Sequence, residues 1–324
     1  MIVALMRNFC TLFDSNYLPR ALVMYHSLVD TSECFTLYVV CFDDLALEVL
    51  NKLNLANLVA IPLGDFESKE LLVVKQTRTV AEYCWTCTPH IIRYVLDTYK
   101  LAQVTYLDAD LSFYEKPSIL LDEFNQSGCS VLITEHRYTP SYNQSATSGI
   151  YCVQFMTFNA DQQGFRVLQW WQDRCLEWCF ARFEDGKFGD QKYLDDWPTR
   201  FEGVHVLQHL GGGVAPWNIQ QYKLSTDNDK LLVNNRPLVF YHFHAYKYYA
   251  NGMHDFAPLY RLNKVVVALL YRPYGLALLN TYDEIMQVVP NFNRGWVKRD
   301  TSLLAKARYF KRMLKGIANE YQIV

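Results

Sequence analysis

The sequence lacks a strong net charge. It has 31 lysine and arginine residues against 33 aspartate and glutamate residues, which leaves a net charge of -2 at pH 7. A chain without an overall basic field does not gather the phosphates of a nucleic acid, so we expect no nucleic-acid partner. The composition is instead 51% hydrophobic over 324 residues, enough to bury a large core in one big domain or two unequal ones.

Long apolar runs are also missing. Arg7 interrupts the apolar opening of the chain, and no lysine or arginine precedes that opening, so it does not resemble a secretion signal. No stretch reaches the roughly 18 unbroken apolar residues that a membrane-spanning helix needs. We therefore expect a cytoplasmic protein.

The chain has no cysteine pattern typical of disulfide-bonded domains. Its nine cysteines are an odd number spread over the whole length, which favours reduced and mostly buried thiols. Cys84 and Cys87 form a CxxC pair, but no second pair and no nearby couple of histidines completes a zinc site. We expect these two residues to pack in the core.

Short apolar runs alternate with amphipathic stretches along the chain. This alternation is typical of a parallel sheet covered by helices. The predicted strands cover residues 3–12, 35–42, 58–63, 103–107, 130–134, 150–158 and 237–244. A helix follows the first strand, a long helix is predicted over 161–183, and a helical tail begins near residue 260. The fold class is therefore α/β, with a mixed, mainly parallel sheet flanked by helices.

Two aspartates follow a predicted buried strand in the run VTYLDADLSFY. Residues two apart in an extended chain project to the same side, so Asp108 and Asp110 can share one cation. Open α/β sheets bind ligands beyond the carboxyl ends of their strands, which is where this pair lies. A hard divalent cation such as Mg²⁺ or Mn²⁺, held by carboxylates, keeps coordination positions for phosphate oxygens. The pair therefore predicts a site for a metal and a nucleotide diphosphate.

Four segments together carry a resemblance to a known family. They are TLFDSNYLPRALVMYHSL, YLDAD, FGDQKYLDDWP and VFYHFHAYKYY, and they span about residues 8 to 250. In this order they resemble glycosyltransferases of the GT-A fold and are most similar to family 8, which includes glycogenin and the lipopolysaccharide galactosyltransferases. The resemblance implies a GT-A catalytic domain over residues 1–258, with a Rossmann-like nucleotide-diphospho-sugar transferase fold, and a helical C-terminal extension over 259–324.

The resemblance assigns donor contacts to the first and third segments. It places Thr11, Asp14 and Tyr17 at the donor nucleoside. It places Asp190 and Gln191 beside the anomeric carbon, where they would hold donor hydroxyls or stabilise a transition state with oxocarbenium character. Structural roles stay open for two of these residues, because Tyr17 would also suit plain packing and Asp190 would also suit a helix cap.

The second and fourth segments supply the metal site implied by the resemblance. Asp108, Ala109 and Asp110 would contact the donor diphosphate, and His242 would complete the metal site. His244 lies two residues further along a predicted strand and would point to the same side, as a phosphate-binding group or a replacement ligand. The alternative for both histidines is a hydrogen-bonded position in the core. The implied cofactor is Mn²⁺ or Mg²⁺.

Further residues are expected to contact the sugar-nucleotide donor. Some stand at positions that depart from the family pattern, and others are lysine or arginine residues outside the four segments. Lys247 stands one residue early for the family lysine that meets the diphosphate, Ala245 replaces a glycine, and Thr147 replaces an asparagine that contacts the donor sugar. Lys75 and Arg78 precede the metal motif and would also reach the diphosphate, because such donors need cationic partners. Surface positions suit these two residues equally well.

The end of the chain combines an apolar stripe with basic residues. The stripe is Leu303, Ala307, Phe310, Leu314, Ile317 and Tyr321, and the basic residues are Lys298, Arg299, Lys306, Arg308, Lys311, Arg312 and Lys315. A helix of this kind would lie on the anionic inner face of a membrane as a peripheral contact. The alternative is that the stripe packs on the catalytic domain while solvent covers the charges.

These features predict a metal-dependent glycosyltransferase of the hexosyltransferase type. It would move a sugar from a nucleoside diphosphate sugar, with a UDP-sugar as first candidate, to a hydroxyl of a glycan, lipid-linked or protein acceptor. The resemblance favours retention of anomeric configuration. One alternative is a sugar nucleotidyltransferase, although residues 11–20 lack the glycine-rich loop with which such enzymes open. The other is a degenerate module that binds nucleotide sugars without catalysis.

Overall fold

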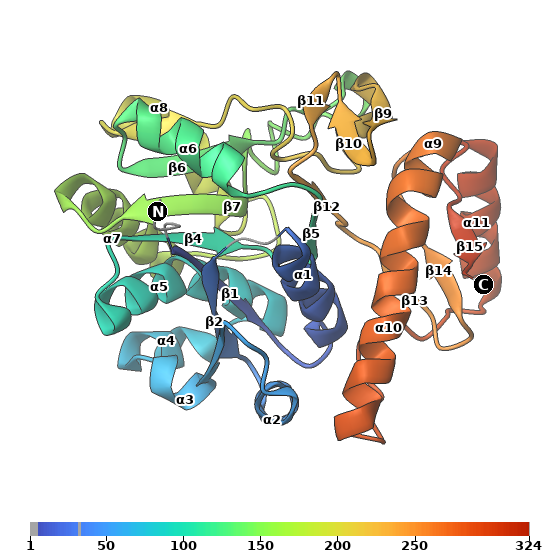
Figure 1. The fold of residues 1–324 in the computed structure, drawn as a ribbon, viewed down its shortest axis with the longest axis horizontal. Coiled ribbons are helices and arrows are strands. Elements are labelled where there is room, and N and C mark those ends of the chain that lie inside the picture. The colour runs from blue at the N-terminus through green and yellow to red at the C-terminus, as the bar shows by residue number, and fades with distance from the viewer. Residues whose placement is uncertain (1–5, 32–33, 324) are drawn as a thin grey trace.

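The computed structural model describes residues 6–31 and 34–323 and centres on a seven-stranded sheet of order β3-β2-β1-β4-β7-β6-β8 (Figure 1). The strands are β1 (Arg7–Phe13), β2 (Phe35–Cys41), β3 (Leu58–Pro62), β4 (Gln103–Leu107), β6 (Val131–Glu135), β7 (Tyr151–Asn159) and β8 (Val204–Val206). Only β7 runs antiparallel to its neighbours β4 and β6. The predicted mixed, mainly parallel sheet is confirmed. The first strand was predicted from residue 3, and residues 1–5 lie outside the described part.

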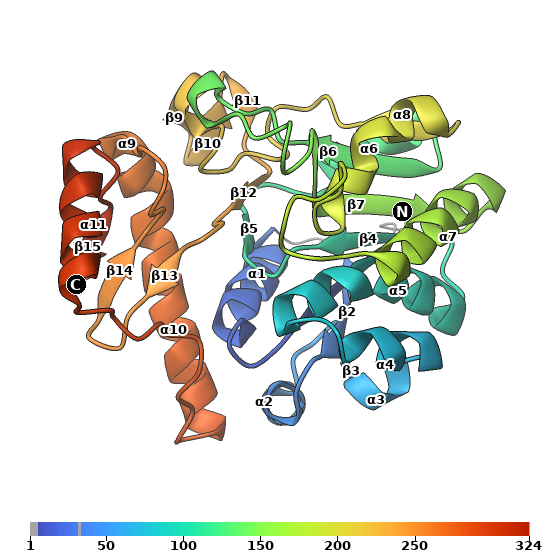
Figure 2. The same ribbon diagram turned by 180° about the vertical axis from the view of Figure 1, so that it is seen from behind.

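Helices cover both faces of this sheet (Figures 1 and 2). One face packs against α1 (Leu18–Asp30), α2 (Asp44–Leu53) and α6 (Ser118–Ser127). The other packs against α3 (Leu63–Phe66), α4 (Lys69–Lys75), α5 (Val80–Tyr99) and α7 (Gln162–Glu177). Each face has its own core, with fully buried rings such as Phe9 and Phe155 on the first side and Phe158 and Trp171 on the second. Burial of these large rings stabilises the three-layer arrangement.

The strand order reverses between β1 and β4. From β1 the chain continues to β2 and β3 on one side, and it then returns to β4 on the other side. In open α/β sheets a ligand site forms at such a reversal, beyond the carboxyl ends of the two strands. β1 ends at Phe13 and β4 ends at Leu107, so Asp14 and Asp108 begin the two segments at this edge.

Two smaller sheets lie between residues 111 and 242. β5 (Leu111–Phe113) follows the DAD segment and pairs antiparallel with β12 (Phe240–His242). β9 (Leu224–Asp227), β10 (Lys230–Val233) and β11 (Arg236–Pro237) form an antiparallel sheet, and α8 (Trp197–Arg200) precedes β8. His242 is opposite Leu111 in the first of these ladders, which brings the histidine beside the DAD segment.

The C-terminal part contains helices and a small sheet. α9 (Lys264–Val266) continues through a π-helical turn at Val267–Tyr271 into α10 (Arg272–Val288), and α11 (Leu303–Leu314) follows. β13 (Lys247–Tyr248) and β14 (Met253–Asp255) form a hairpin that pairs with β15 (Glu320–Gln322). Of these strands only β15 lies in the predicted helical extension, residues 259–324, so the sheet links that extension to residues 247–255 and is an addition to the prediction. No helix in the described ranges combines the length and the apolar character needed to cross a bilayer.

Arg20 ties the first helix to the C-terminal part. Its guanidinium is buried and donates to the carbonyl oxygens of Asn16 at 3.2 Å and Tyr246 at 3.1 Å. Because α1 also packs against α10, the turn after β1 is held between the sheet and the extension (Figure 1).

Two predicted elements were too long. The helix predicted over 161–183 is α7, which begins after Asp161 caps the amide of Gly164 and ends before Trp178, where the backbone becomes extended. The strand predicted over 237–244 is reduced to β12, because the chain turns after His242 and the amide of Tyr246 bonds back to Phe243. Both errors come from apolar residues that continue past the end of the regular backbone.

The predicted apolar stripe of the tail is only partly helical. α11 ends at Leu314, and Gly316 takes a left-handed φ of +65°. Ile317 and Tyr321 lie beyond the helix, and Tyr321 belongs to β15, where its ring stacks on Phe256 with centroids 4.8 Å apart. The prediction of one continuous helix through Tyr321 is therefore wrong.

Candidate active site

A cavity of about 670 Å³ opens beyond the carboxyl ends of β1 and β4. Its volume suits a small-molecule or nucleotide-sized ligand. The residues singled out from the sequence that line it are Asp14, Tyr17, Asp108, Ala109, Asp110, Asp190, Gln191, His242 and His244. The structure thus brings residues from all four sequence segments together around one cavity, at the point where the strand order of the sheet reverses.

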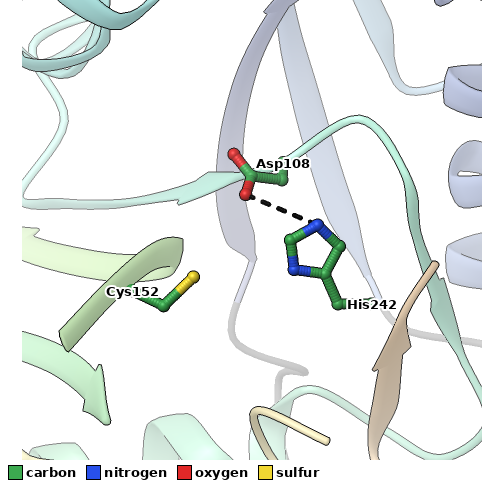
Figure 3. A group of neighbouring side chains, drawn as sticks. All are labelled: Asp108, Cys152 and His242. Carbon is green, nitrogen blue, oxygen red and sulfur yellow. Dashed lines mark ion pairs between the residues drawn. The ribbon is translucent and has the colours of Figure 1, made fainter. Parts of the chain in front are cut away.

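Asp108, Asp110 and His242 lie together in the wall of this cavity. His242 Nε2 lies 3.0 Å from Asp110 Oδ1. It lies 3.9 Å from Asp108 Oδ2, and Figure 3 shows this second contact. Backbone hydrogen bonds of 3.0 Å fix the arrangement, because the Asp108 amide donates to the Gln154 carbonyl and the Phe243 amide donates to the Asp110 carbonyl. The two carboxylates therefore face one imidazole, but Ala109 and Asp110 form a turn and not the extended backbone on which the prediction was based.

Gln154, which the sequence reasoning missed, orients His242. His242 Nδ1 lies 2.7 Å from Gln154 Oε1, and both side chains are buried. With this amide oxygen as acceptor, Nδ1 donates its proton and Nε2 faces the two carboxylates. In metal-binding histidines, a hydrogen bond from the ring nitrogen that does not bind the metal fixes the tautomer and the ring orientation.

The charges of these three groups depend on one another. Burial alone would raise the pKa of Asp110, but the charge and the hydrogen bond of His242 lower it to about 2. Burial raises the pKa of Asp108 to about 6, with His242 opposing the rise and Asp110 adding to it. Burial would lower the pKa of His242, but Asp110 raises it well above the ordinary value. Asp110 and His242 therefore form a buried ion pair, and a cation held by these groups would require His242 to lose its proton.

The donor set fits a divalent cation. Carboxylate oxygens suit Mg²⁺ and Mn²⁺, and an imidazole nitrogen is a common further ligand of transition metals. Cys152 adds a thiol that the sequence reasoning missed, since ligand atoms of Asp108, Cys152 and His242 all lie within 4.8 Å of one another (Figure 3). A thiol is the softest of these ligands, so the carboxylates and His242 are the groups that match a hard cation.

Asp190 lines the same cavity and does not act as a helix cap. It is only 5% exposed, and its side chain makes no capping hydrogen bond to the short helix that follows. Trp171 Nε1 donates to its carbonyl oxygen at 2.9 Å, which fixes the backbone. Burial, followed by the charge of Asp108, raises the pKa of its carboxyl to about 7. Gln191 lies next to it and donates to the Ser148 carbonyl at 2.6 Å.

The turn after β1 contributes two polar side chains to the cavity. Asp14 Oδ1 accepts hydrogen bonds from the amides of Asn16 at 3.0 Å and Tyr17 at 3.2 Å, so this carboxylate holds the turn that begins α1. Tyr17 is 47% exposed and lines the cavity. Its ring is therefore not a core residue, which was the alternative left open by the sequence.

His244 lies in a turn and still faces the cavity. Its ring and that of His242 each lie 5.3 Å from the Trp217 ring, measured between centroids. Ala245 follows with a φ of +60°, which is the left-handed region that glycine adopts freely. Alanine adopts it at a cost of about 1 kcal/mol, so the turn forms despite the missing glycine. Burial and the charge of His242 lower the pKa of His244 to about 4, which keeps this imidazole neutral.

Five residues predicted to bind the donor do not line the cavity: Thr11, Lys75, Arg78, Thr147 and Lys247. Lys75 pairs with Glu67 at 2.6 Å, and the guanidinium of Arg78 lies 3.8 Å from the ring centroid of Phe180. The structure therefore does not bring either cation to the metal site. Thr11 is buried within β1, Thr147 is exposed in a turn, and Lys247 lies in β13.

The lining is acidic. Its residues, all within the described part of the chain, include Asp14, Asp108, Asp110 and Asp190 but neither lysine nor arginine. Carboxylates repel an anionic ligand at short range, most strongly where water is excluded. An anion that binds here therefore needs a cation that the lining side chains do not supply.

Aromatic residues that the sequence reasoning missed form much of the remaining wall. They are Trp85, Tyr106, Tyr138, Phe188, Trp217 and Tyr260. Trp217 Nε1 donates to the His136 carbonyl at 3.0 Å, which fixes its ring beside the two histidines. Tyr106 and Phe188 belong to the segments YLDAD and FGDQKYLDDWP, whereas the other four residues lie outside the four segments. Only the folded chain shows that all six line one cavity.

Comparison with solved structures identifies the fold. The galactosyltransferase LgtC, solved in complex with donor and acceptor sugar analogues, matches with a TM-score of 0.53 and 13% identity over 84% of this chain and 95% of that chain. An active-site mutant of LgtC matches with a TM-score of 0.51 and 12% identity over the same shares. The chain has the GT-A glycosyltransferase fold, and the predicted likeness to the galactosyltransferase type is confirmed at the level of the fold.

Comparison of sequences identifies the family. The uncharacterized protein YfnF of Bacillus subtilis is 30% identical over 301 residues, which cover 90% of this chain and 98% of YfnF. YfnD of the same organism is 29% identical over 297 residues, which cover 90% of this chain and 95% of YfnD. The chain belongs to the family of YfnF. No protein-family model matches it.

Proposed function

We propose that this chain is a metal-dependent glycosyltransferase, which moves a sugar from a nucleoside diphosphate sugar to an acceptor hydroxyl with retention of configuration. The observation that carries this proposal is the acidic cavity at the strand reversal, with His242 between Asp108 and Asp110 and no lysine or arginine among the described lining residues. A diphosphate enters such a cavity together with a divalent cation. A UDP-sugar is the first candidate donor.

Asp108, Asp110 and His242 are the proposed ligands for Mn²⁺ or Mg²⁺. When bound, such a cation neutralises the charge that develops on a departing diphosphate. Gln154 holds His242 in the tautomer that metal binding requires. The exposed ring of Tyr17 is the proposed contact of the nucleoside, and Ala109 and His244 are proposed neighbours of the diphosphate.

Asp190 and Gln191 are the proposed partners of the transferred sugar. With a pKa of about 7, Asp190 exists in both protonation states near neutral pH. As an acid it donates a hydrogen bond to a sugar hydroxyl, and as a carboxylate it stabilises positive charge at the anomeric carbon.

Retention of configuration is proposed from the family resemblance. NMR assignment of the first-formed anomer tests it, because an inverted product contradicts the family 8 mechanism.

The acceptor is proposed to bind along the aromatic wall. Tyr138, Trp217 and Tyr260 present apolar ring surface in a cavity that is otherwise acidic. Rings with a few polar neighbours are typical of sites that orient a small ligand. A glycan, a lipid-linked sugar or a protein would supply the hydroxyl.

Catalysis is assigned to residues 1–258, and residues 259–324 are the proposed extension. The proposed location of the protein is the cytoplasm.

Replacing Gln154 by leucine is expected to weaken Mn²⁺ binding about 10- to 100-fold, because His242 loses the acceptor that fixes its tautomer. Calorimetric titration of the protein with Mn²⁺ measures the affinity. Gln169→Leu is a matched control, since Gln169 is exposed on α7 and bonds only Asp173 in the described part of the chain. Equal affinities in both variants would show that Gln154 does not position the ligand.

A thermal-shift panel of nucleoside diphosphate sugars, with and without Mn²⁺, tests the proposed function. We expect one nucleotide family to raise the melting temperature only when Mn²⁺ is present, since ligand at about 100 times its dissociation constant adds about 2.7 kcal/mol of stability. Donor hydrolysis or transfer to an acceptor then identifies the transferase.

Turnover assays beside this panel separate the alternatives. Release of pyrophosphate from a nucleoside triphosphate and a sugar phosphate would identify a nucleotidyltransferase. Metal-dependent stabilisation without any turnover would identify a binding module. Stabilisation by no nucleotide sugar, or equal stabilisation in the presence of EDTA, would contradict the proposal.

A further inference from the structure

Helix α11 packs onto the C-terminal part through its polar side. Ala305, Tyr309 and Arg312 are half-buried and lie on one side of the helix. The guanidinium of Arg312 donates to Asp255 Oδ1 at 2.8 Å, and Asp255 is fully buried in β14. An ion pair, rather than an apolar contact, therefore anchors the helix.

The opposite side of α11 is apolar and faces solvent. Leu303, Phe310 and Leu314 are 84%, 60% and 74% exposed, and Ala307 is exposed between them. The spacing of these four positions places them on one stripe of the helix. The alternative in which this part of the stripe packs on the catalytic domain is therefore wrong. A run of large exposed apolar residues on one helix face marks an interaction site.

Lysines border the exposed stripe and have no carboxylate partner in the described part of the chain. These lysines are Lys306, Lys311 and Lys315. The neighbouring arginines are paired, Arg299 with Glu320, Arg308 with Asp300, and Arg312 with Asp255. The charges that remain available around the stripe are therefore all positive.

The position of α11 leaves this face accessible. Figures 1 and 2 show α11 as the outermost element of the C-terminal part, with α10 and the β13-β14-β15 sheet between it and the catalytic sheet. A flat surface can approach the outer face of α11 without touching the cavity at the ends of β1 and β4.

We infer that the outer face of α11 binds the surface of an anionic lipid bilayer, with the helix axis parallel to the membrane plane. Leu303, Phe310 and Leu314 would enter the boundary between headgroups and acyl chains, and the bordering lysines would contact anionic headgroups. The helix has 12 residues, which is too short to span a bilayer but sufficient for an interfacial contact. A protein partner fits less well, because lysine is depleted from protein interfaces.

This inference concerns an interaction surface and does not depend on the transferase activity. Flotation of the full chain with vesicles of phosphatidylcholine containing about one-third phosphatidylglycerol tests it, with vesicles of pure phosphatidylcholine alongside. We expect binding to the anionic vesicles to be at least about tenfold stronger, and to be mostly lost at about 1 M salt, where charges are screened.

Two variants test the two parts of the surface. Phe310→Gln with Leu314→Gln removes apolar area from exposed positions, so we expect a loss of vesicle binding with unchanged circular dichroism. The matched control is Val73→Gln with Leu259→Gln, which changes two exposed residues elsewhere and should bind like the parent chain.

The charge variant replaces Lys306, Lys311 and Lys315 by glutamate, and we expect it to lose anionic vesicle binding. Its control, with glutamate at the exposed positions Lys69, Lys116 and Lys223, has the same change in net charge and should keep binding. Equal loss in both would show that net charge alone is responsible and would overturn the assignment to α11. The assignment would also be overturned if the parent chain did not bind vesicles. It would be overturned as well if the parent chain self-associated and lost that self-association when Phe310 and Leu314 were changed.

Discussion

Replacing Asp110 by asparagine is expected to lower kcat/KM for sugar transfer about 10³-fold while the fold is kept. Asp110 Oδ1 lies 3.0 Å from His242 Nε2, and Asp108 Oδ2 lies 3.9 Å from the same nitrogen. The amide has the shape of the carboxylate but no charge, so the site attracts a divalent cation less strongly. Because the described lining offers no lysine or arginine, nothing else there compensates for the diphosphate charge.

Two measurements separate the causes of this loss. Steady-state turnover with saturating Mn²⁺ reports on the reaction, and calorimetric titration with Mn²⁺ alone reports on the metal site. Asp97→Asn is the matched control, because Asp97 is an exposed carboxylate on α5 that pairs with Arg93 at 2.6 Å. It should leave both quantities unchanged. Wild-type turnover and Mn²⁺ affinity in Asp110→Asn would remove Asp110 from the metal site and the proposed function with it.

The parts of the site that depend on local geometry could be predicted from the sequence. Asp108 and Asp110 follow directly after a buried strand, and their place at this edge follows from the parallel sheet. The backbone turns at Ala109 and Asp110, so the extended backbone from which their convergence was predicted is not present. His242 lies far along the chain, and its place was expected from a family motif rather than from physics. The β5-β12 ladder supplies the physical reason, because it puts His242 opposite Leu111.

The parts that depend on long-range packing could not be predicted. Gln154 and Cys152 reach the metal site because β7 pairs antiparallel with β4, and the sequence reasoning gave neither residue a role. Lys75 and Arg78 were expected at the diphosphate on the basis of charge, yet charge gives no information on distance, and both side chains contact neighbours outside the cavity. Strand ends were also uncertain, since nothing local marks the turn at Ala245.

The same distinction applies to the fold. The alternation of apolar runs and amphipathic helices was enough to predict a mainly parallel sheet covered on both faces, because that pattern follows from burial within each segment. The C-terminal sheet was not predictable in this way. β15 pairs with β14, so the hairpin is completed by a strand from the very end of the chain, and no local pattern records that partner.

Replacing Asp190 by asparagine is expected to slow turnover about 10²-fold or more and, at the same time, to stabilise the folded protein. Burial, followed by the charge of Asp108, raises the folded pKa of Asp190 from its ordinary value of 3.8 to about 7. A raised acid pKa leaves stability intact below about pH 4, and stability is lost as the pH rises toward 7.

Asparagine resembles the neutral acid, so the variant should lack this loss. Urea unfolding of the metal-free proteins should show similar stabilities near pH 4 and an advantage of about 1–3 kcal/mol for the variant near pH 8. Asp97→Asn serves again as the control, because an exposed carboxylate has no buried charge to remove. The prediction fails if the variant turns over slowly but is no more stable than the parent at pH 8. Ionisation of Asp190 would then cost no folding free energy, and its carboxyl would not be partly protonated near neutral pH.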